Sequence, residues 1–360
     1  MQCPGSATIE HQIFYFRDLS NAKVYADLLR PGGIALTHLQ YEMDRAEIDR
    51  VVAAAQGYQL QSNSKVALEQ GYGADRAMLA RCPNLLAVSM PGSGYEAANL
   101  ADCTEAGVLV VNQAGLHAAA VAQHALGMMI CLSKRIIQAH MAMHGDADWS
   151  PRGYGGHEID GKTLGIAGFG AVGQRLAEIC GGAFGMRVMT HHPRMSDADI
   201  RARGAEPVDF DAMLQQSDFV VAALPLTDWT RGMFGAREFA LMKPEAYFVT
   251  VARGGIHDED ALAAALRRGE VAGAGLDVWQ VEPPPADHPL LGFPNVLTTP
   301  HTAGMTEESR LRVARGAAAQ WCNIFEGGRP PRLLNPEAWP RYVDRYARIM
   351  GQSVKEHAEP

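Results

Sequence analysis

The sequence predicts an α/β protein in which a doubly wound parallel sheet is inserted into a smaller α/β domain. The chain has 360 residues, which is long enough for two domains. After Gly161, short apolar runs alternate with helical patterns, as in a parallel sheet with right-handed crossovers. Further helix-like and strand-like segments precede this region, and a helical segment follows it. We therefore expect residues 116–302 to form a dinucleotide-type domain and residues 1–115 with 303–360 to form the smaller domain.

The expected elements of the first part are short. The segment ADRAMLARC is predicted to be a helix, and LLAVSM (85–90) and GVLVVN (107–112) are predicted strands. A long helical pattern then covers residues 118–143. Its apolar residues occupy most of the circumference, so we expect this helix to be buried between domains or subunits.

The central domain shows six predicted strands, namely TLGIAG, RVMTHH, FVVAALP, AYFVTVA, AGAGLDVW and NVLTTPH. The clearest helix between them is HDEDALAAALRRG. It has acidic residues in its first turn, Leu262 and Leu266 one turn apart, and a basic end closed by Gly269. After His301 the chain returns to a helix, and the tail 336–360 is expected to add one short helix.

Composition argues against several classes of partner. The net charge is −8 and no basic block occurs, which argues against nucleic acid or an anionic membrane as the main partner. The N-terminus lacks a secretory pattern, and the most apolar segment, HALGMMICLS, is too short to span a bilayer. The six cysteines form no CxxC pair. They predict free thiols in a reducing cytoplasm and no metal site.

The stretch TLGIAGFGAVGQRLAEI contains a GxGxxG motif between a strand and a helix, which is the context of a dinucleotide fingerprint. Gly168 permits the tight turn, Gly170 lets a pyrophosphate approach the backbone, and Gly173 lets the helix pack on the strand. The helix N-terminus then offers N–H donors to phosphate. The alternative is a glycine-rich turn without a ligand. The expected cofactor contacts here are Gly168, Phe169, Gly170, Ala171, Val172 and Gly173, in a Rossmann-type domain.

The end of the second central strand bears on the choice of cofactor. An acidic residue that grips the adenosine ribose would fall at His192, which lies 19 residues after Gly173. His192 repels no phosphate, and Arg194 is able to pair with one. We therefore favour NADP over NAD. The alternative is that Arg194 is a solvated loop residue.

Three segments, VARGGIHDEDAL, AGLDVWQVEPPPADHPL and NVLTTPHTAG, resemble the D-isomer-specific 2-hydroxyacid dehydrogenases. This family includes glyoxylate/hydroxypyruvate reductases and phosphoglycerate dehydrogenase, and the resemblance extends from about Pro91 to Asn335. It implies a flavodoxin-like substrate domain beside the Rossmann-type one. It further implies the following roles: Arg253 as the substrate arginine, Glu282 as the carboxylate, His301 as the acid/base and Asp277 as the residue that holds the nicotinamide carboxamide.

The chemistry agrees with these roles. Reducing a 2-oxo acid needs a hydride at C2 and a proton on the carbonyl oxygen, which the imidazole of His301 is suited to give. A hydrogen-bonded carboxylate at Glu282 favours imidazolium, and the Arg253 guanidinium is suited to bind the α-carboxylate. Taken singly, each residue has an alternative as a surface ion pair, a loop acid or a turn former. Their joint occurrence on strand ends favours catalysis.

Further contacts follow from the resemblance. The loop MPGSGYEAAN matches a carboxylate-binding loop, so the N–H groups of Ser93 and Gly94 are expected to bind substrate. The alternative is an ordinary strand-to-helix turn. Ser62 and Asn63 are expected to face the same cleft. The additional cofactor contacts expected are Val121, Leu224, Pro225, Val251 and Ala252. Ala223 and Thr250 depart from the family pattern, and this is expected to alter cofactor contacts and not the reaction.

The sequence thus predicts a cytoplasmic, homodimeric enzyme that interconverts a 2-oxo acid and a D-2-hydroxy acid with NADP or NAD. Three alternatives stay open. One is a nucleotide-sensing scaffold or co-repressor of the same fold, and another is a dehydrogenase of a compound that is not a 2-oxo acid. The third is a formate-type dehydrogenase, against which Glu282 speaks, because glutamine is expected there in that relative.

Overall fold

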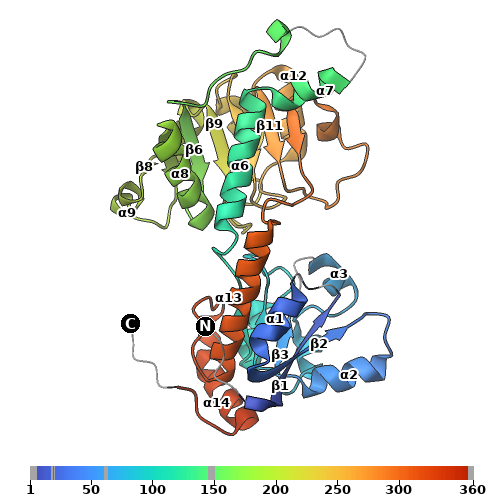
Figure 1. Ribbon diagram of the computed structural model, residues 1–360. Helices are drawn as coiled ribbons and strands as arrows, with labels where there is room; N and C mark the ends of the chain where they lie inside the picture. The colour runs from blue at the N-terminus through green and yellow to red at the C-terminus, as the bar shows by residue number, and fades with distance from the viewer. Residues whose placement is uncertain (1–5, 18, 20, 61–63, 145–150, 356–360) are drawn as a thin grey trace. The chain divides into compact units, whose positions relative to one another are not determined.

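The computed structural model describes residues 6–17, 19, 21–60, 64–144 and 151–355, so Ser62 and Asn63 lie outside the described residues. The chain divides into two compact units (Figure 1). The first contains Met1–His117 and Glu307–Pro360, and the second contains Ala118–Thr306. Across the described ranges, no helix combines the length and apolar character needed to cross a membrane.

The first unit is a five-stranded parallel sheet with the order β2-β1-β3-β4-β5. This is the flavodoxin-like order, so that part of the predicted fold is confirmed. Its strands are β1 (Ser6–Phe16), β2 (Gly32–Leu39), β3 (Gly57–Gln59), β4 (Ala87–Ser89) and β5 (Leu109–Val111). Its helices are α1 (Ala22–Leu29), α2 (Arg45–Ala54), α3 (Ser64–Glu69), α4 (Arg76–Arg81), α5 (Leu100–Ala106), α13 (Glu307–Phe325) and α14 (Trp339–Met350).

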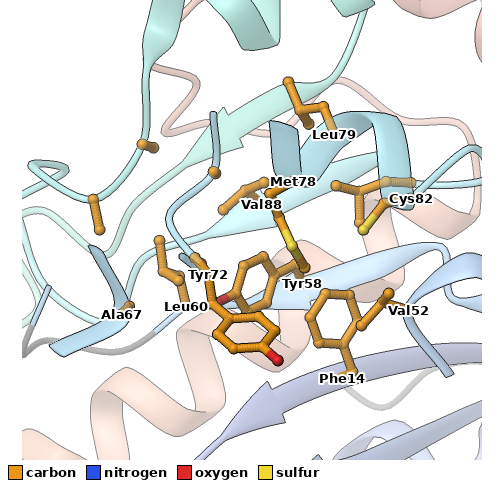
Figure 2. Close-up of a cluster of buried hydrophobic side chains, with 14 of the residues drawn as sticks. Phe14, Val52, Tyr58, Leu60, Ala67, Tyr72, Met78, Leu79, Cys82 and Val88 are labelled. Carbon is orange, nitrogen blue, oxygen red and sulfur yellow. The ribbon is translucent and has the colours of Figure 1, made fainter. Parts of the chain in front are cut away.

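Two buried clusters cover the faces of this sheet. On one face, Phe14 stacks on Tyr58 with 4.3 Å between ring centroids, and Met78 and Val88 pack around them (Figure 2). On the other, α13 and α14 contribute fully buried rings, of which Trp321 lies against β3. A Cβ at Gly57 would lie 2.9 Å from the Trp321 ring, so this approach requires glycine. The predicted tail helix is α14, and its aromatic residues complete the core.

The second unit is a seven-stranded parallel sheet with the order β12-β11-β10-β9-β6-β7-β8. This is the Rossmann order with one additional strand, which confirms the predicted class. Its strands are β6 (Thr163–Ala167), β7 (Arg187–His191), β8 (Glu206–Pro207), β9 (Phe219–Ala222), β10 (Tyr247–Thr250), β11 (Gly273–Leu276) and β12 (Val296–Thr298). Its helices are α6 (Ala118–Ser133), α7 (Ile136–His144), α8 (Ala171–Phe184), α9 (Asp197–Ala202), α10 (Phe210–Gln216), α11 (Ala236–Leu241) and α12 (Glu259–Arg268).

The prediction of one long helix over 118–143 is wrong. The helix is interrupted between α6 and α7. The Ser133 carbonyl accepts a hydrogen bond from the His157 N–H at 2.8 Å, in place of the bond that a continuing helix would make. Arg135 then takes a left-handed conformation with φ 55°. A Cβ at Gly156 would lie 2.3 Å from the Ser133 oxygen, so the returning segment passes close to the helix end. α6 buries its apolar side within its own unit, with Met128 beside β11 at Gly275.

The cysteines divide into two kinds. Among the described residues, Cys82, Cys103, Cys131 and Cys180 are free thiols and Cys322 is disulfide-bonded, while Cys3 lies outside the described residues. The prediction of free thiols throughout is therefore wrong for Cys322, because a lack of CxxC spacing does not exclude a disulfide. Burial raises the pKa of Cys82, Cys103 and Cys180 to about 12, so these thiols stay protonated and unreactive near neutral pH.

His257 is a polar side chain placed in the apolar core of the second unit. It is 1% exposed, lies beside the Phe248 ring, and neither ring nitrogen has a hydrogen-bond partner among the described residues. Burial lowers its pKa to about 4, and the smaller effect of the Asp258 charge opposes this while that of His288 adds to it. The folded state thus favours the neutral ring, whereas the unfolded chain protonates near pH 6.5.

The stability of the protein is therefore expected to fall as pH drops from about 6.5 towards about 4. His257→Val removes two unpaired nitrogens and is expected to raise the free energy of unfolding by about 1–3 kcal/mol at pH 7, and by more at pH 5. Urea denaturation at both pH values tests this, with the exposed His38→Val as control. A His257→Val protein with the same pH dependence as wild type would contradict the argument.

Candidate active site

The candidate residues of the second unit lie at one edge of its sheet. All but Val121, which lies in α6, and Glu282, which lies further along the chain after β11, closely follow a strand, and the carboxyl ends of parallel strands share an edge, where ligands bind in open α/β sheets. In strand order from one end, they are His301 after β12, Asp277 after β11, Arg253 after β10, Leu224 and Pro225 after β9, Gly168–Gly173 after β6, and His192 and Arg194 after β7.

The glycine turn after β6 has the geometry that a phosphate group requires. Gly168 has φ 93°, and a Cβ there would lie 2.7 Å from the Ala223 oxygen. A Cβ at Gly173 would lie 2.4 Å from the Gly168 oxygen, so the turn and helix also need this second glycine. Gly170 is the N-cap of α8, faces open space, and supplies no side-chain cap. The first-turn N–H groups of α8 are thus offered to an anion, and the loop fits a pyrophosphate.

The end of β7 carries no carboxylate. His192 is half-buried, and burial lowers its pKa; a backbone hydrogen bond of the same residue opposes this, and the charges of Arg194 and His191 add to the lowering. Its ring is therefore neutral near pH 7. Arg194 is exposed two residues later. This corner of the cofactor site is neutral to positive.

His301 and Glu282 form a fixed pair. The Nδ1 atom of His301 lies 2.8 Å from Oε2 of Glu282, and the Trp279 N–H donates to Oε1 of the same carboxylate at 3.1 Å. Both side chains keep about two fifths of their surface exposed, 41% for His301 and 38% for Glu282. Since Nδ1 faces the carboxylate, Nε2 is the atom left to exchange a proton with a ligand.

Electrostatics keeps this carboxylate ionised. Burial raises the pKa of Glu282, but the hydrogen bond and charge of His301, the Trp279 N–H and the charge of Arg253 together outweigh it. The net pKa lies below the ordinary value. The ionised carboxylate accepts a hydrogen bond from Nδ1 and so fixes the orientation of the His301 ring.

The His301 loop is held by Asp277, which is 1% exposed. The His301 N–H donates to the Asp277 backbone carbonyl at 2.8 Å, and His301 has the left-handed φ of 55°. Such a backbone costs on the order of 1–2 kcal/mol for a non-glycine residue, so it needs support. The Asp277 carboxylate supplies it by accepting three hydrogen bonds, from Thr299 Oγ1 at 2.6 Å, Thr302 N at 2.8 Å and Ala303 N at 3.0 Å.

Asp277 therefore has a structural task that the sequence did not suggest, while its contact with a carboxamide stays a prediction. His124 on α6 joins the same network, with Nε2 at 3.0 Å from Thr299 Oγ1. Sequence reasoning missed His124 and Thr299. The sequence gave no signal for this contact because the two residues are 175 positions apart, and the quoted segments that contain them, HALGMMICLS and NVLTTPHTAG, do not indicate a contact between them.

Arg253 is placed by the two glycines that follow it. A Cβ at Gly254 would lie 1.9 Å from the Trp279 carbonyl oxygen, so only glycine lets this loop lie against the backbone that leads to Glu282. Gly255 has φ 80°. Arg253 donates from Nη1 to its neighbour's carbonyl, Ala252 O, at 2.7 Å, and its charge acts on Glu282. The structure thus brings Arg253, Glu282 and His301 into one constellation.

The remaining candidates differ in burial and belong to both units. Val251 and Ala252, which precede Arg253 in the chain, are buried, Leu224 and Val121 are partly buried, and Pro225 is exposed. Ser93 and Gly94 lie in the loop after β4, which belongs to the first unit. Within the described residues, no group of three or more His, Cys, Asp or Glu side chains is arranged to hold a metal ion.

Known proteins resemble this chain along most of its length. Residues 126–303 match the NAD-binding domain of the D-isomer-specific 2-hydroxyacid dehydrogenases. A glyoxylate reductase of Aeropyrum pernix is 38% identical over 270 residues, which are 73% of this chain and 80% of that protein. A glyoxylate/hydroxypyruvate reductase B of Shigella boydii is 35% identical over 73% of this chain and 82% of its own.

A solved structure agrees with the fold. A glyoxylate reductase from Paecilomyes thermophila superposes with a TM-score of 0.77 and 27% identity, covering 91% of this chain and 98% of that chain. Sequence, fold and site therefore point the same way. The chain belongs to the D-isomer-specific 2-hydroxyacid dehydrogenases, which interconvert 2-oxo acids and D-2-hydroxy acids with a nicotinamide cofactor.

Proposed function

We propose that this protein reduces glyoxylate, hydroxypyruvate or a larger 2-oxo acid, with His301 as proton donor. The observation that carries the proposal is the His301–Glu282 hydrogen bond of 2.8 Å, in which both carboxylate oxygens are fixed while the imidazole keeps one nitrogen for substrate. The names of the relatives from Aeropyrum pernix and Shigella boydii support the substrate class.

Each residue has a distinct task in this proposal. The guanidinium of Arg253 binds the α-carboxylate and polarises the keto group through charge-assisted hydrogen bonds. His301 gives its Nε2 proton to the keto oxygen as the alcohol forms, and Glu282 stabilises the charged ring beforehand. The nicotinamide, when bound, supplies the hydride. We assign its phosphates to Gly168–Gly173, its ribose corner to His192 and Arg194, and its remaining contacts to Val121, Leu224, Pro225, Val251, Ala252 and Asp277.

A substrate screen tests this proposal directly. The oxidation of NADPH is followed over a panel of 2-oxo acids that includes glyoxylate, hydroxypyruvate and larger analogues, and is repeated with NADH. We expect turnover with at least one of them and a D-configured product where the product is chiral. A protein that binds the cofactor but reduces no 2-oxo acid would refute the assigned reaction.

The proposed cofactor is NADP(H), because an acid is missing at the end of β7. We expect a lower KM for NADPH than for NADH. His192→Asp places a carboxylate that binds ribose hydroxyls and repels a 2′-phosphate, and so shifts the preference towards NADH. Arg194→Ala is expected to raise the KM for NADPH alone. Equal increases for both cofactors in the Arg194 variant would mean that this residue does not contact the 2′-phosphate.

We further propose a homodimer formed with a second copy of this chain. α7 supports this, because none of its described residues is buried and its apolar side chains face solvent in the single chain. These side chains are Ile136, Ile137, Met141 and Met143, exposed by 45%, 40%, 63% and 58%. Light scattering at micromolar concentration is expected to give the dimer mass, and Ile137→Glu with Met141→Glu is expected to give monomers. A monomeric wild type would contradict this.

The proposed compartment is the cytoplasm, on the argument from the four free cysteines. The disulfide at Cys322 is the observation that opposes it. Thiol titration of the protein from freshly lysed cells, under alkylating conditions, measures whether Cys322 is oxidised in its own compartment.

A further inference from the structure

The loop after β4 is held in a specific way. Three successive carbonyl oxygens of residues 91–93 accept hydrogen bonds from the segment 112–117. The pairs are Pro91 O with His117 Nε2 at 3.2 Å, Gly92 O with Gln113 N at 2.9 Å, and Ser93 O with Asn112 Nδ2 at 2.9 Å. With the carbonyls turned to this segment, the N–H groups of Ser93 and Gly94 donate to no protein group among the described residues.

His117 is itself fixed on its other side. Its Nδ1 lies 2.8 Å from the hydroxyl of Ser309, which is fully buried in the first turn of α13. A carbonyl oxygen only accepts hydrogen bonds, so Nε2 of His117 carries the hydrogen that Pro91 receives. In the neutral ring, Nδ1 is then the acceptor for the Ser309 hydroxyl. Both ring nitrogens are therefore used, one on the loop and one on the helix.

The position of this histidine in the chain is distinctive. The chain passes from one unit to the other between His117 and Ala118, and returns between Thr306 and Glu307. His117 thus stands at the first crossing and binds a residue just after the second. α13 also holds the same segment by Arg312 Nε donating to Leu116 O at 3.1 Å and by Gln320 Nε2 donating to Asn112 O at 3.0 Å.

We propose that His117 is a positioning residue for the substrate, which fixes the loop 91–94 so that the Ser93 and Gly94 N–H groups bind the carboxylate of the 2-oxo acid. The inference rests on the proposed function and names a residue that this function did not use. Two adjacent N–H groups bind an anion well only while the backbone holds them convergent. His117 supplies this constraint, and it is the last residue before the chain enters the second unit. The conformation of the loop 91–94 is therefore linked to the segment that connects the two units.

Kinetics of two variants test the proposal. His117→Ala removes the donor to Pro91 and is expected to raise the KM for glyoxylate by about tenfold, as the loss of one useful hydrogen bond implies. His117→Gln keeps an N–H near the Nε2 position and is expected to restore most of the affinity. The Kd for NADPH, measured by fluorescence titration, is expected to stay unchanged in both. His38→Ala, an exposed histidine of the same unit, is the matched control.

Three kinetic results would overturn the proposal: an unchanged KM in His117→Ala, an equal defect in His117→Gln, or a parallel rise in the Kd for NADPH. A hydrogen-exchange experiment separates this from a failure of the proposed function. Oxamate with cofactor is expected to slow amide exchange of residues 91–95 in wild type and His117→Gln, but not in His117→Ala. Equal protection in all three proteins overturns the role of His117, even if no oxo acid in the panel is turned over.

Discussion

His301→Ala is expected to lower kcat by on the order of a hundredfold or more, while the protein still binds NADPH. The reason is geometric. The imidazole is the only group of the constellation whose free nitrogen is able to deliver a proton, since Glu282 is tied by both oxygens to His301 and Trp279. The proposed phosphate loop, Gly168–Gly173, follows β6 at another strand end of the sheet, so the loss is expected to concern the chemical step and to leave that loop intact.

Single-turnover and steady-state measurements with NADPH and glyoxylate check this result. His157→Ala is a suitable control, because His157 is exposed in the same unit and its structural contacts use its backbone. Glu282→Gln is expected to fall between wild type and His301→Ala, since it keeps a hydrogen-bond partner for Nδ1 but loses the charge that favours imidazolium. Near-normal turnover in His301→Ala would remove the histidine from the reaction.

The sequence predicted the site where the signal was local. The glycine turn, the arginine before two glycines and the histidine after a proline each lie in a short segment that follows a strand. Because strand ends of a parallel sheet share an edge, their meeting could be inferred from the order of the strands alone. The contact between Glu282 and His301 belongs to this class, although it joins residues that are 19 positions apart.

What could not be predicted depends on contacts between distant segments. The end of α6 is decided by the His157 N–H, which takes the Ser133 carbonyl, and no pattern within 118–143 reports that. The support of His301 by Asp277, Thr299 and His124 likewise joins three elements. β8 was not expected because two residues at the sheet edge give no periodicity. These failures share one cause, namely hydrogen bonds whose partner is chosen by the tertiary fold.

The second large effect is expected at Arg253. Arg253→Lys keeps a positive charge but loses the planar guanidinium that binds a carboxylate through two parallel N–H groups. We expect kcat/KM for the 2-oxo acid to fall by about a hundredfold, because one donor aimed at a developing oxyanion has an effect of this order. KM is expected to rise and kcat to fall together, since the same group binds the substrate and polarises it.

The backbone around Arg253 makes this substitution a clean test. The approach to the Trp279 carbonyl is made by Gly254 and the turn by Gly255, so lysine at 253 leaves the loop path unchanged. Arg203→Lys, which alters an exposed arginine paired with Asp199 in the same unit, is the control.

The pKa of Glu282 provides a second readout, because the Arg253 charge lowers it. Arg253→Ala should therefore raise the pKa of Glu282, whereas Arg253→Lys should largely preserve it. Wild-type values of KM and kcat in Arg253→Lys would mean that the guanidinium geometry serves the loop and not the substrate.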